Sequence, residues 1–198
     1  MWPANSAYQV GGSHGFFCVA LAKKFPSLKF VVQDLPKTVA DGPSKIPEDL
    51  LDRIEFQAHD FYTPQPVKDA DVYFFRWICH NQSDKYGTKM LQQLIPALKP
   101  GARIVINDNC LPKPNTADPW DEKITRYVVL PCFRKSGEVL SNISRTMDVT
   151  MLELLNAKER DVDDWMKLFS MADPRFKFLG AKQPKGSRMS IMEAVWEP

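Results

Sequence analysis

A glycine-rich run near the start of the chain and an acid downstream of it have the types and spacing of a nucleoside-binding site. The run reads Gly11-Gly12-Ser13-His14-Gly15, and Asp34 ends the next apolar run. Glycines let the backbone approach a ligand closely, and a carboxylate at this spacing accepts hydrogen bonds from two ribose hydroxyls. The pattern predicts a bound nucleoside cofactor; the alternative is a tight turn between a strand and a helix.

The same run narrows the choice of cofactor. Gly11, Ser13 and Gly15 read G-x-S-x-G, so the third glycine of the dinucleotide pattern has no clear counterpart, and the P-loop lysine is missing as well. A cofactor with a ribose but no phosphate fits better. S-adenosyl-L-methionine (SAM) is the common cofactor of that kind.

A histidine and two acids have the residue types of an acid–base site. His80 follows the fourth apolar run, Asp108 follows the fifth, and Glu159 precedes a helical pattern. Ligands of open α/β sheets bind beyond the carboxyl ends of the strands, and an unperturbed histidine titrates near pH ~6.5. A histidine base normally has a carboxylate on its other ring nitrogen. The alternatives are a hydrogen-bonded structural histidine and two solvated acids; His14 and His59 are weaker candidates for the base.

The elements that must position these residues are strand-length apolar runs separated by helical patterns. They predict an α/β fold with a mostly parallel seven-stranded sheet, helices on both faces, and an antiparallel edge strand from a closing hairpin. The expected strands are Ala7–Val10, Lys29–Gln33, Ile54–Ala58, Ala70–Phe75, Arg103–Asn107, Phe176–Ala181 and Met189–Trp196. The expected helices are Phe16–Phe25, Ser83–Leu98, Trp120–Leu130, Ser144–Leu155 and Asp161–Met171.

Composition favours a cytoplasmic globular domain. The chain has 198 residues, a formal net charge of +2 and no dense Lys/Arg run, so nucleic-acid binding is not expected. The longest apolar runs are too short for a membrane span, and the start does not resemble a signal peptide. The cysteines lack C-x-x-C spacing and share no ligand spacing with the histidines, so we expect reduced thiols and no metal site; they are Cys18, Cys79, Cys110 and Cys132.

These motifs together resemble the catalytic domain of SAM-dependent O-methyltransferases of the caffeic-acid type from plants and fungi. The segments that carry the resemblance are Val10–Gly15 with Leu21–Pro26, Val31–Pro36, His59–Phe61 and Lys99–Arg103. It covers essentially the whole chain, so residues 1–198 would form one class I (Rossmann-like) methyltransferase domain. The family's N-terminal helical domain, which supplies dimer contacts and part of the substrate lid, would be absent.

The resemblance implies a role for each matching residue. His80 would be the catalytic base, flanked by Asp108 and Glu159. The residues implied to bind the cofactor are Gly11, Gly12, Ser13, Gly15, Asp34, Leu35, Asp60, Phe61 and Arg76. The implied reaction removes a proton from a phenolic hydroxyl of a small aromatic or polyketide-like secondary metabolite and transfers a methyl group to that oxygen.

The chain departs from the family pattern at two places. Gln9 stands where the family usually has an acid, and Asn81-Gln82 stands where it usually has Asp-Trp. The alternative is therefore a methyltransferase-like protein without methyl transfer, either a catalyst of a pericyclic or elimination reaction or a partner subunit. Helical patterns such as Ser144–Leu155 would be partly uncovered, so we also expect a homodimer or docking to a chain that supplies the lid.

Overall fold

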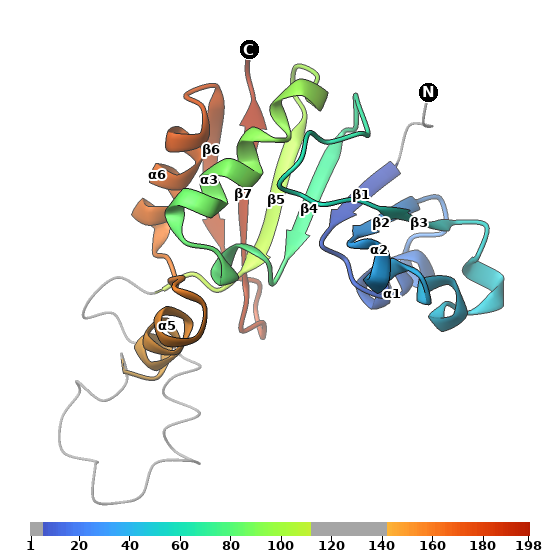
Figure 1. Ribbon diagram of the computed structural model, residues 1–198, viewed down its shortest axis with the longest axis horizontal. Helices are drawn as coiled ribbons and strands as arrows, with labels where there is room; N and C mark the ends of the chain where they lie inside the picture. Colours follow the sequence, from blue (N-terminus) through green and yellow to red (C-terminus); the bar gives the residue numbers. More distant parts are fainter. Residues whose placement is uncertain (1–5, 112–141) are drawn as a thin grey trace, which may run out of the picture.

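The computed structural model describes residues 6–111 and 142–198. The predicted helix Trp120–Leu130 and Cys132 lie outside these residues. Within them the chain forms a seven-stranded sheet in the order β3-β2-β1-β4-β5-β7-β6 (Figure 1). None of the described helices is long and apolar enough to cross a membrane.

The strands lie where apolar runs predicted them, with ends that differ by a residue or two. Their bounds are β1 Ser6–Val10, β2 Lys29–Asp34, β3 Ile54–Ala58, β4 Val72–Arg76, β5 Arg103–Asp108, β6 Phe176–Lys182 and β7 Ser190–Trp196. Strands β1 to β5 pair in parallel, and β7 pairs antiparallel with both β5 and β6. The antiparallel strand, which we predicted at the edge of the sheet, is β7, and it lies one position inside the edge. The crossover from β5 to β6 leaves a gap between these two strands, and β7 fills it.

Helices lie on both faces of the sheet, as predicted. The α-helices are α1 Phe16–Lys24, α2 Pro36–Val39, α3 Asp84–Gln92, α5 Asn142–Leu155 and α6 Val162–Ala172. Short 3₁₀ helices are η1 Gly42–Lys45, η2 Glu48–Leu50, η3 Cys79–Asn81 and η4 Ile95–Ala97. Helix α6 begins at the predicted cap, where Asp161 Oδ1 accepts a hydrogen bond from the Asp164 N–H at 2.9 Å.

The long helix predicted over Ser83–Leu98 is wrong in its second half. Helix α3 ends at Gln92, and the chain continues as the 3₁₀ helix η4. Pro96 causes the break, since it lacks an N–H and its ring clashes with the carbonyl one helical turn earlier, which belongs to Gln92. The apolar stripe of Met90, Leu91 and Leu94 still packs in the main core.

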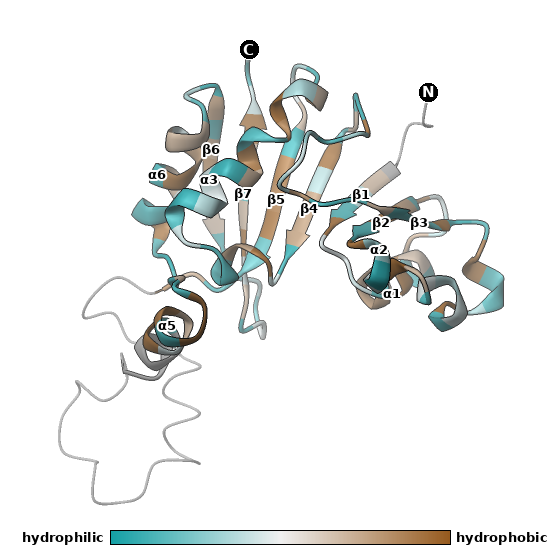
Figure 2. Cartoon of the chain, in the orientation of Figure 1, coloured by the Kyte–Doolittle hydropathy of each residue, from teal (hydrophilic) through white to brown (hydrophobic). Residues whose placement is uncertain are grey.

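The main core lies between the sheet and helices α3 and α6, and it joins side chains from β1, β4, β5, β6 and β7. In Figure 2 the central strands β4 and β5 are largely hydrophobic, whereas α3 in front of them carries hydrophilic residues. A second, smaller core lies under α1 on the other face, around Val32 and Cys18. The parallel strands and these two cores bring the carboxyl ends of β1, β2, β4 and β5 to one rim.

Candidate active site

The glycine-rich loop joins β1 to α1, and its backbone needs the residues that the sequence places there. Gly11 and Gly15 have φ values of 69° and 74°, a region that favours glycine. A Cβ on Gly12 would lie 2.7 Å from Val32 Cγ1, so this position has no room for a side chain. The Gly12 N–H donates to the Gln33 carbonyl at 2.9 Å, which fixes the loop to the end of β2.

Asp34 lies against this loop, as predicted. Its Oδ2 accepts a hydrogen bond from the Ser13 N–H at 2.8 Å, and its Oδ1 accepts one from the Leu35 N–H at 2.8 Å. Each carboxylate oxygen has two lone pairs, so both can accept a further hydrogen bond. Asp34 can therefore hold the loop and bind two ribose hydroxyls at the same time.

The predicted adenine-binding segment follows β3 at the same rim. The His59 N–H donates to the Asp34 carbonyl at 2.8 Å, and Asp60 Oδ1 accepts a hydrogen bond from the Tyr62 N–H at 2.9 Å. The Phe61 ring lies 3.7 Å from the place of a Cβ on Gly11. The structure thus brings the glycine loop, Asp34, Asp60 and Phe61 together.

Arg76 and Gln9 lie on the face of the sheet that α1 covers. The Arg76 guanidinium lies 5.4 Å from the centroid of the Phe17 ring, and its Nη2 donates to Met189 Sδ at 3.8 Å. Gln9 is buried and its Oε1 accepts a hydrogen bond from Cys18 Sγ at 2.9 Å. Gln9 thus supports the loop from the sheet side. The predicted contact of Arg76 with the cofactor stays a prediction.

His80 lies in η3, directly beyond β4, and its side chain is buried. The His80 Nδ1 lies 3.3 Å from Glu159 Oε1. With a proton on Nδ1 donated to this carboxylate, the Nε2 lone pair is left to accept a proton. A buried imidazole–carboxylate pair of this kind is the arrangement that a general base requires.

Glu159 lies between α5 and α6, and it is only 3% exposed rather than a solvated surface acid. Its N–H donates to Asp148 Oδ1 of α5 at 2.8 Å, and its Oε1 also accepts a hydrogen bond from Asn109 Nδ2 at 3.2 Å. No described residue donates to Oε2. The carboxylate is therefore held in place with accepting capacity to spare.

Asp108 is the last residue of β5 and fully buried, but it holds the main chain of His80 rather than its ring. Its Oδ2 accepts a hydrogen bond from the His80 N–H at 3.1 Å, and its Oδ1 accepts one from the Asn109 N–H at 3.0 Å. Burial raises the pKa of Asp108 to about 6. These two hydrogen bonds thus orient the η3 turn, whereas Glu159 contacts the ring.

Trp77 is a residue of this site that we did not predict. Its φ of 56° lies in the left-handed region, where a bulky side chain is a genuine outlier. Its ring meets the His80 ring edge-on, with centroids 4.5 Å apart. The Trp77 N–H donates to the Asn107 carbonyl at 3.2 Å, which ties this strained residue to β5.

His80, Asp108 and Glu159 also have the composition of a cation site. Their ligand atoms all lie within 4.8 Å of one another. Spacing along the chain suggested no metal site because these residues come from three distant segments that meet only in the fold.

Of the weaker base candidates, His14 pairs with the Asp41 carboxylate at 3.2 Å, and burial lowers the pKa of His59 beside Asp60.

The glycine loop with Asp34 lies at the same rim as a buried imidazole–carboxylate pair, the arrangement that we expect of a cofactor-dependent transferase domain. A family model described as an O-methyltransferase domain matches residues 2–174, and the chain belongs to this family. It is 48% identical over 190 residues to chlorophenol O-methyltransferase of Trichoderma longibrachiatum, covering 95% of this chain and 37% of that protein. It is 46% identical over 197 residues to the grayanic acid biosynthesis cluster O-methyltransferase of Cladonia grayi, covering 98% and 39%. The chain thus spans less than half the length of these relatives.

Solved structures show the same fold at lower identity. The match to LepI in complex with SAM has a TM-score of 0.77 at 24% identity and covers 100% of this chain and 45% of that one. The match to human N-acetylserotonin methyltransferase in complex with SAM has a TM-score of 0.73 at 19% identity and covers 98% and 48%. The predicted family and the class I methyltransferase fold are confirmed.

The raised pKa of Asp108 predicts a pH dependence of stability. Between about pH 4 and pH 6 the folded state keeps a proton that the unfolded state releases, so the ionised form lowers the free energy of unfolding by about 2–3 kcal/mol as pH rises. The substitution Asp108→Asn removes this loss of stability, because the amide does not ionise. Urea unfolding should show Asp108→Asn gaining that much stability relative to wild type between about pH 4 and pH 7.

The matched control is Asp173→Asn. A hydrogen bond from Arg175 lowers the pKa of Asp173 to about 2, so this group stays ionised in both states over most of that range. Its effect on stability should be nearly constant there. An equally flat profile for Asp108→Asn would contradict the buried, proton-retaining carboxyl.

Proposed function

We propose that this chain is the catalytic domain of a SAM-dependent O-methyltransferase that methylates a phenolic hydroxyl, with His80 as the general base. The observation that carries the proposal is the buried contact between His80 Nδ1 and Glu159 Oε1 at 3.3 Å. It lies beyond β4, whose neighbour β1 leads into the glycine loop, and this loop in turn contacts Asp34 at the end of β2. A base and a nucleoside site at one rim is what methyl transfer to a weakly acidic hydroxyl needs.

The residues at the rim fit the cofactor. The main chain of Gly11, Gly12, Ser13 and Gly15 leaves room for close approach, and Asp34 keeps lone pairs for two ribose hydroxyls. Leu35, Asp60, Phe61 and Arg76 complete the proposed set. When bound, SAM supplies an electrophilic methyl group on a positively charged sulfonium.

The base must offset an unfavourable proton transfer. A phenol with a pKa near 10 and an unperturbed imidazole near 6.5 differ by about 3.5 units, which is about 5 kcal/mol. The Glu159 carboxylate lies beside the imidazolium that forms and stabilises its charge in a buried setting. Holding the acceptor oxygen between His80 Nε2 and the methyl donor contributes the rest through proximity.

The relatives support the proposed substrate class. Two proteins at 46–48% identity are named for a chlorophenol and for a fungal biosynthesis cluster, which supports a small aromatic or polyketide-like acceptor. The half-buried aromatic Trp77 beside His80 is suited to contact such a ring. The alternative, a methyltransferase-like protein without methyl transfer, is separated from this proposal by product formation.

We also propose that the chain works against a second polypeptide, either another copy or a chain that supplies the lid. We expected helix α5 to be partly uncovered, and it exposes large apolar side chains at Val149, Leu152, Leu154 and Leu155, whereas Met151 is buried. Figure 1 shows α5 beyond the carboxyl ends of β4 and β5, and Asp148 of α5 accepts a hydrogen bond from the N–H of Glu159. Exposed apolar groups at a site usually mark an interface.

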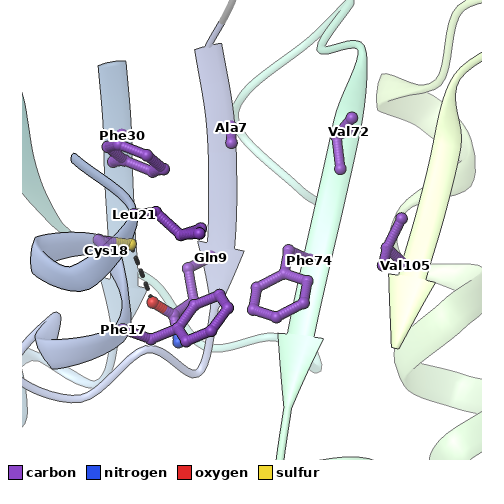
Figure 3. Close-up of a pocket in the computed structure, with 9 residues that line it drawn as sticks. All are labelled: Ala7, Gln9, Phe17, Cys18, Leu21, Phe30, Val72, Phe74 and Val105. Atoms are coloured by element: carbon purple, nitrogen blue, oxygen red, sulfur yellow. Dashed lines mark hydrogen bonds between the residues drawn. The ribbon is translucent and has the colours of Figure 1, made fainter. Parts of the chain in front are cut away.

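A second feature supports this proposal on the α1 face of the sheet. An apolar cavity of about 160 Å³ lies beside α1, and Figure 3 shows Phe17, Phe74 and Val105 on its walls. The Phe17 and Phe74 rings stack at 4.8 Å, yet Phe74 and Val105 in the central strands are only half-buried. Central strands of a parallel sheet are normally covered on both faces, so this face has unfilled apolar surface.

The first prediction of the proposed function concerns cofactor binding. Asp34→Ala should weaken SAM binding by about 1.5–3 kcal/mol, the worth of hydrogen bonds to a charged group, measured by isothermal titration calorimetry. Asp52→Ala, an exposed acid after η2, is the control and should bind SAM as wild type does. A wild-type chain that does not bind millimolar SAM would contradict the cofactor assignment.

The second prediction concerns the base. His80→Ala should remove formation of S-adenosylhomocysteine with phenolic acceptors and leave SAM affinity unchanged, because the imidazole acts on the acceptor. Glu159→Gln and Asp108→Asn should each cost less than loss of the histidine. Product analysis by mass spectrometry is the measurement, and wild-type turnover in His80→Ala would refute the assignment. SAM binding without any product from the wild type would instead favour the alternative function.

The third prediction concerns the exposed face of α5. Leu152→Glu with Leu154→Glu should convert an assembled protein into a smaller species, because burying two carboxylates in an apolar contact is costly. Light scattering on the full chain measures the size of the species. The control is Leu179→Glu, a substitution at an exposed strand residue. A monodisperse wild-type monomer with full activity would show that no partner is needed.

A further inference from the structure

Arg160, the residue after Glu159, is a fully buried arginine with 0% exposure. Its guanidinium uses each of its nitrogens as a hydrogen-bond donor. Nε and Nη2 donate to Asp84 Oδ1 at 3.1 and 2.9 Å, and Nη1 donates to the Cys79 carbonyl at 2.9 Å. Nη2 also donates to the Gln82 carbonyl at 2.8 Å, and Nη1 lies at 3.5 Å from the Lys158 carbonyl. An arginine has five N–H donors, and this one has a partner for each.

The two carbonyls from the η3 region identify what this arginine holds. Cys79 is the first residue of η3 and Gln82 is its C-cap, so the guanidinium bridges the two ends of the turn that carries His80. The Arg160 side chain therefore fixes the backbone of the turn at both ends. Lysine could not make this fork, because its ammonium is a point donor on a flexible stem.

The charge of Arg160 is balanced without using the acids of the active site. Asp84, at the start of α3, pairs with Arg160 through Oδ1 and with Lys158 through Oδ2 at 3.0 Å. Burial alone would raise the pKa of Asp84, but the hydrogen bonds from Lys158 and Arg160 outweigh it and lower the pKa. The Arg160 guanidinium also lies 5.4 Å from the centroid of the Trp165 ring. Glu159 is thus left free of this cation and available to His80.

We infer that Arg160 is a positioning residue, which sets the distance between the His80 ring and the Glu159 carboxylate. Glu159 contacts the ring, and the adjacent Arg160 holds the backbone on either side of that ring, so one dipeptide fixes both partners of the contact. The inference rests on the proposed function insofar as His80 is the base. None of the hydrogen bonds of Arg160 described above goes to a proposed cofactor residue or to the side chains of His80 and Glu159.

The test compares two variants of Arg160 with a matched arginine. Arg160→Ala and Arg160→Lys should lower kcat about 100-fold, the scale of a misplacement of about 1 Å at a catalytic group, with SAM affinity unchanged. The acid limb of the pH–rate profile should move to lower pH, because the imidazolium loses its carboxylate. Added guanidinium ion should restore part of kcat to Arg160→Ala and none to Arg160→Lys, in which the lysine side chain fills the site.

Arg175→Ala is the control, since Arg175 likewise pairs with an aspartate, Asp173, and lies over a tryptophan, Trp196, but is remote from η3 in the fold. It should leave kcat and the pH profile unchanged. Wild-type kcat in the folded Arg160 variants would overturn the positioning role. So would a lowered kcat without a shift of the pH–rate profile and without recovery of Arg160→Ala by guanidinium. If Arg160→Ala does not fold, the pH profile of Arg160→Lys decides alone.

A readout without turnover separates this inference from the proposed function. The imidazole resonances of His80, assigned by comparison with His80→Ala, should shift and titrate differently in Arg160→Lys but not in Arg175→Ala. If the wild type forms no methylated product, the proposed function fails while this comparison still tests the positioning. Identical His80 titrations in wild type and Arg160→Lys would overturn it whatever the activity.

Discussion

The contact between His80 and Glu159 is the interaction on which the rest of the site depends. It joins residues 79 positions apart and takes a carboxylate almost completely out of water. An isolated buried carboxylate is costly, so it must be hydrogen-bonded. The N–H of Glu159 is anchored by Asp148 and its Oε1 is bonded by Asn109, which means that α5 and the end of β5 must both be in place.

The parallel sheet makes this convergence possible. Parallel strands end at one rim, so the residues after β4 and at the end of β5 meet there although 28 positions separate His80 from Asp108. The crossover through α6 brings the segment before that helix to the same rim. The proposed nucleoside-binding groups collect beyond β1, β2 and β3 by the same geometry, and the two halves of the proposed site share one edge of one sheet.

Much of this arrangement could be predicted from the sequence, because apolar runs and breakers are local signals. The strands and α6 with its Asp161 cap were found within a residue or two, whereas α3 was made too long by continuing its apolar stripe through Pro96. The roles of Asp108 and Arg160 could not be found this way. Both side chains bond to main-chain groups of the η3 turn, and a bond to a carbonyl or an N–H leaves no residue type at a fixed spacing to recognise.

The charges around His80 explain why these main-chain bonds matter. The charge of Arg160 is neutralised by Asp84. When Asp108 and Glu159 are both ionised and His80 is neutral, the buried cluster of these three residues therefore carries two negative charges, and no described cation pairs with it. A proton on His80 reduces that excess to one, which favours the step in which the ring takes a proton from an acceptor. Burial is the main cause of the raised pKa of Asp108, and the nearby charge of Glu159 adds to it. A turn free to move could relieve the cost of that excess by rotating His80 or Glu159 toward water, and the bonds from Arg160 and to Asp108 are what prevent it.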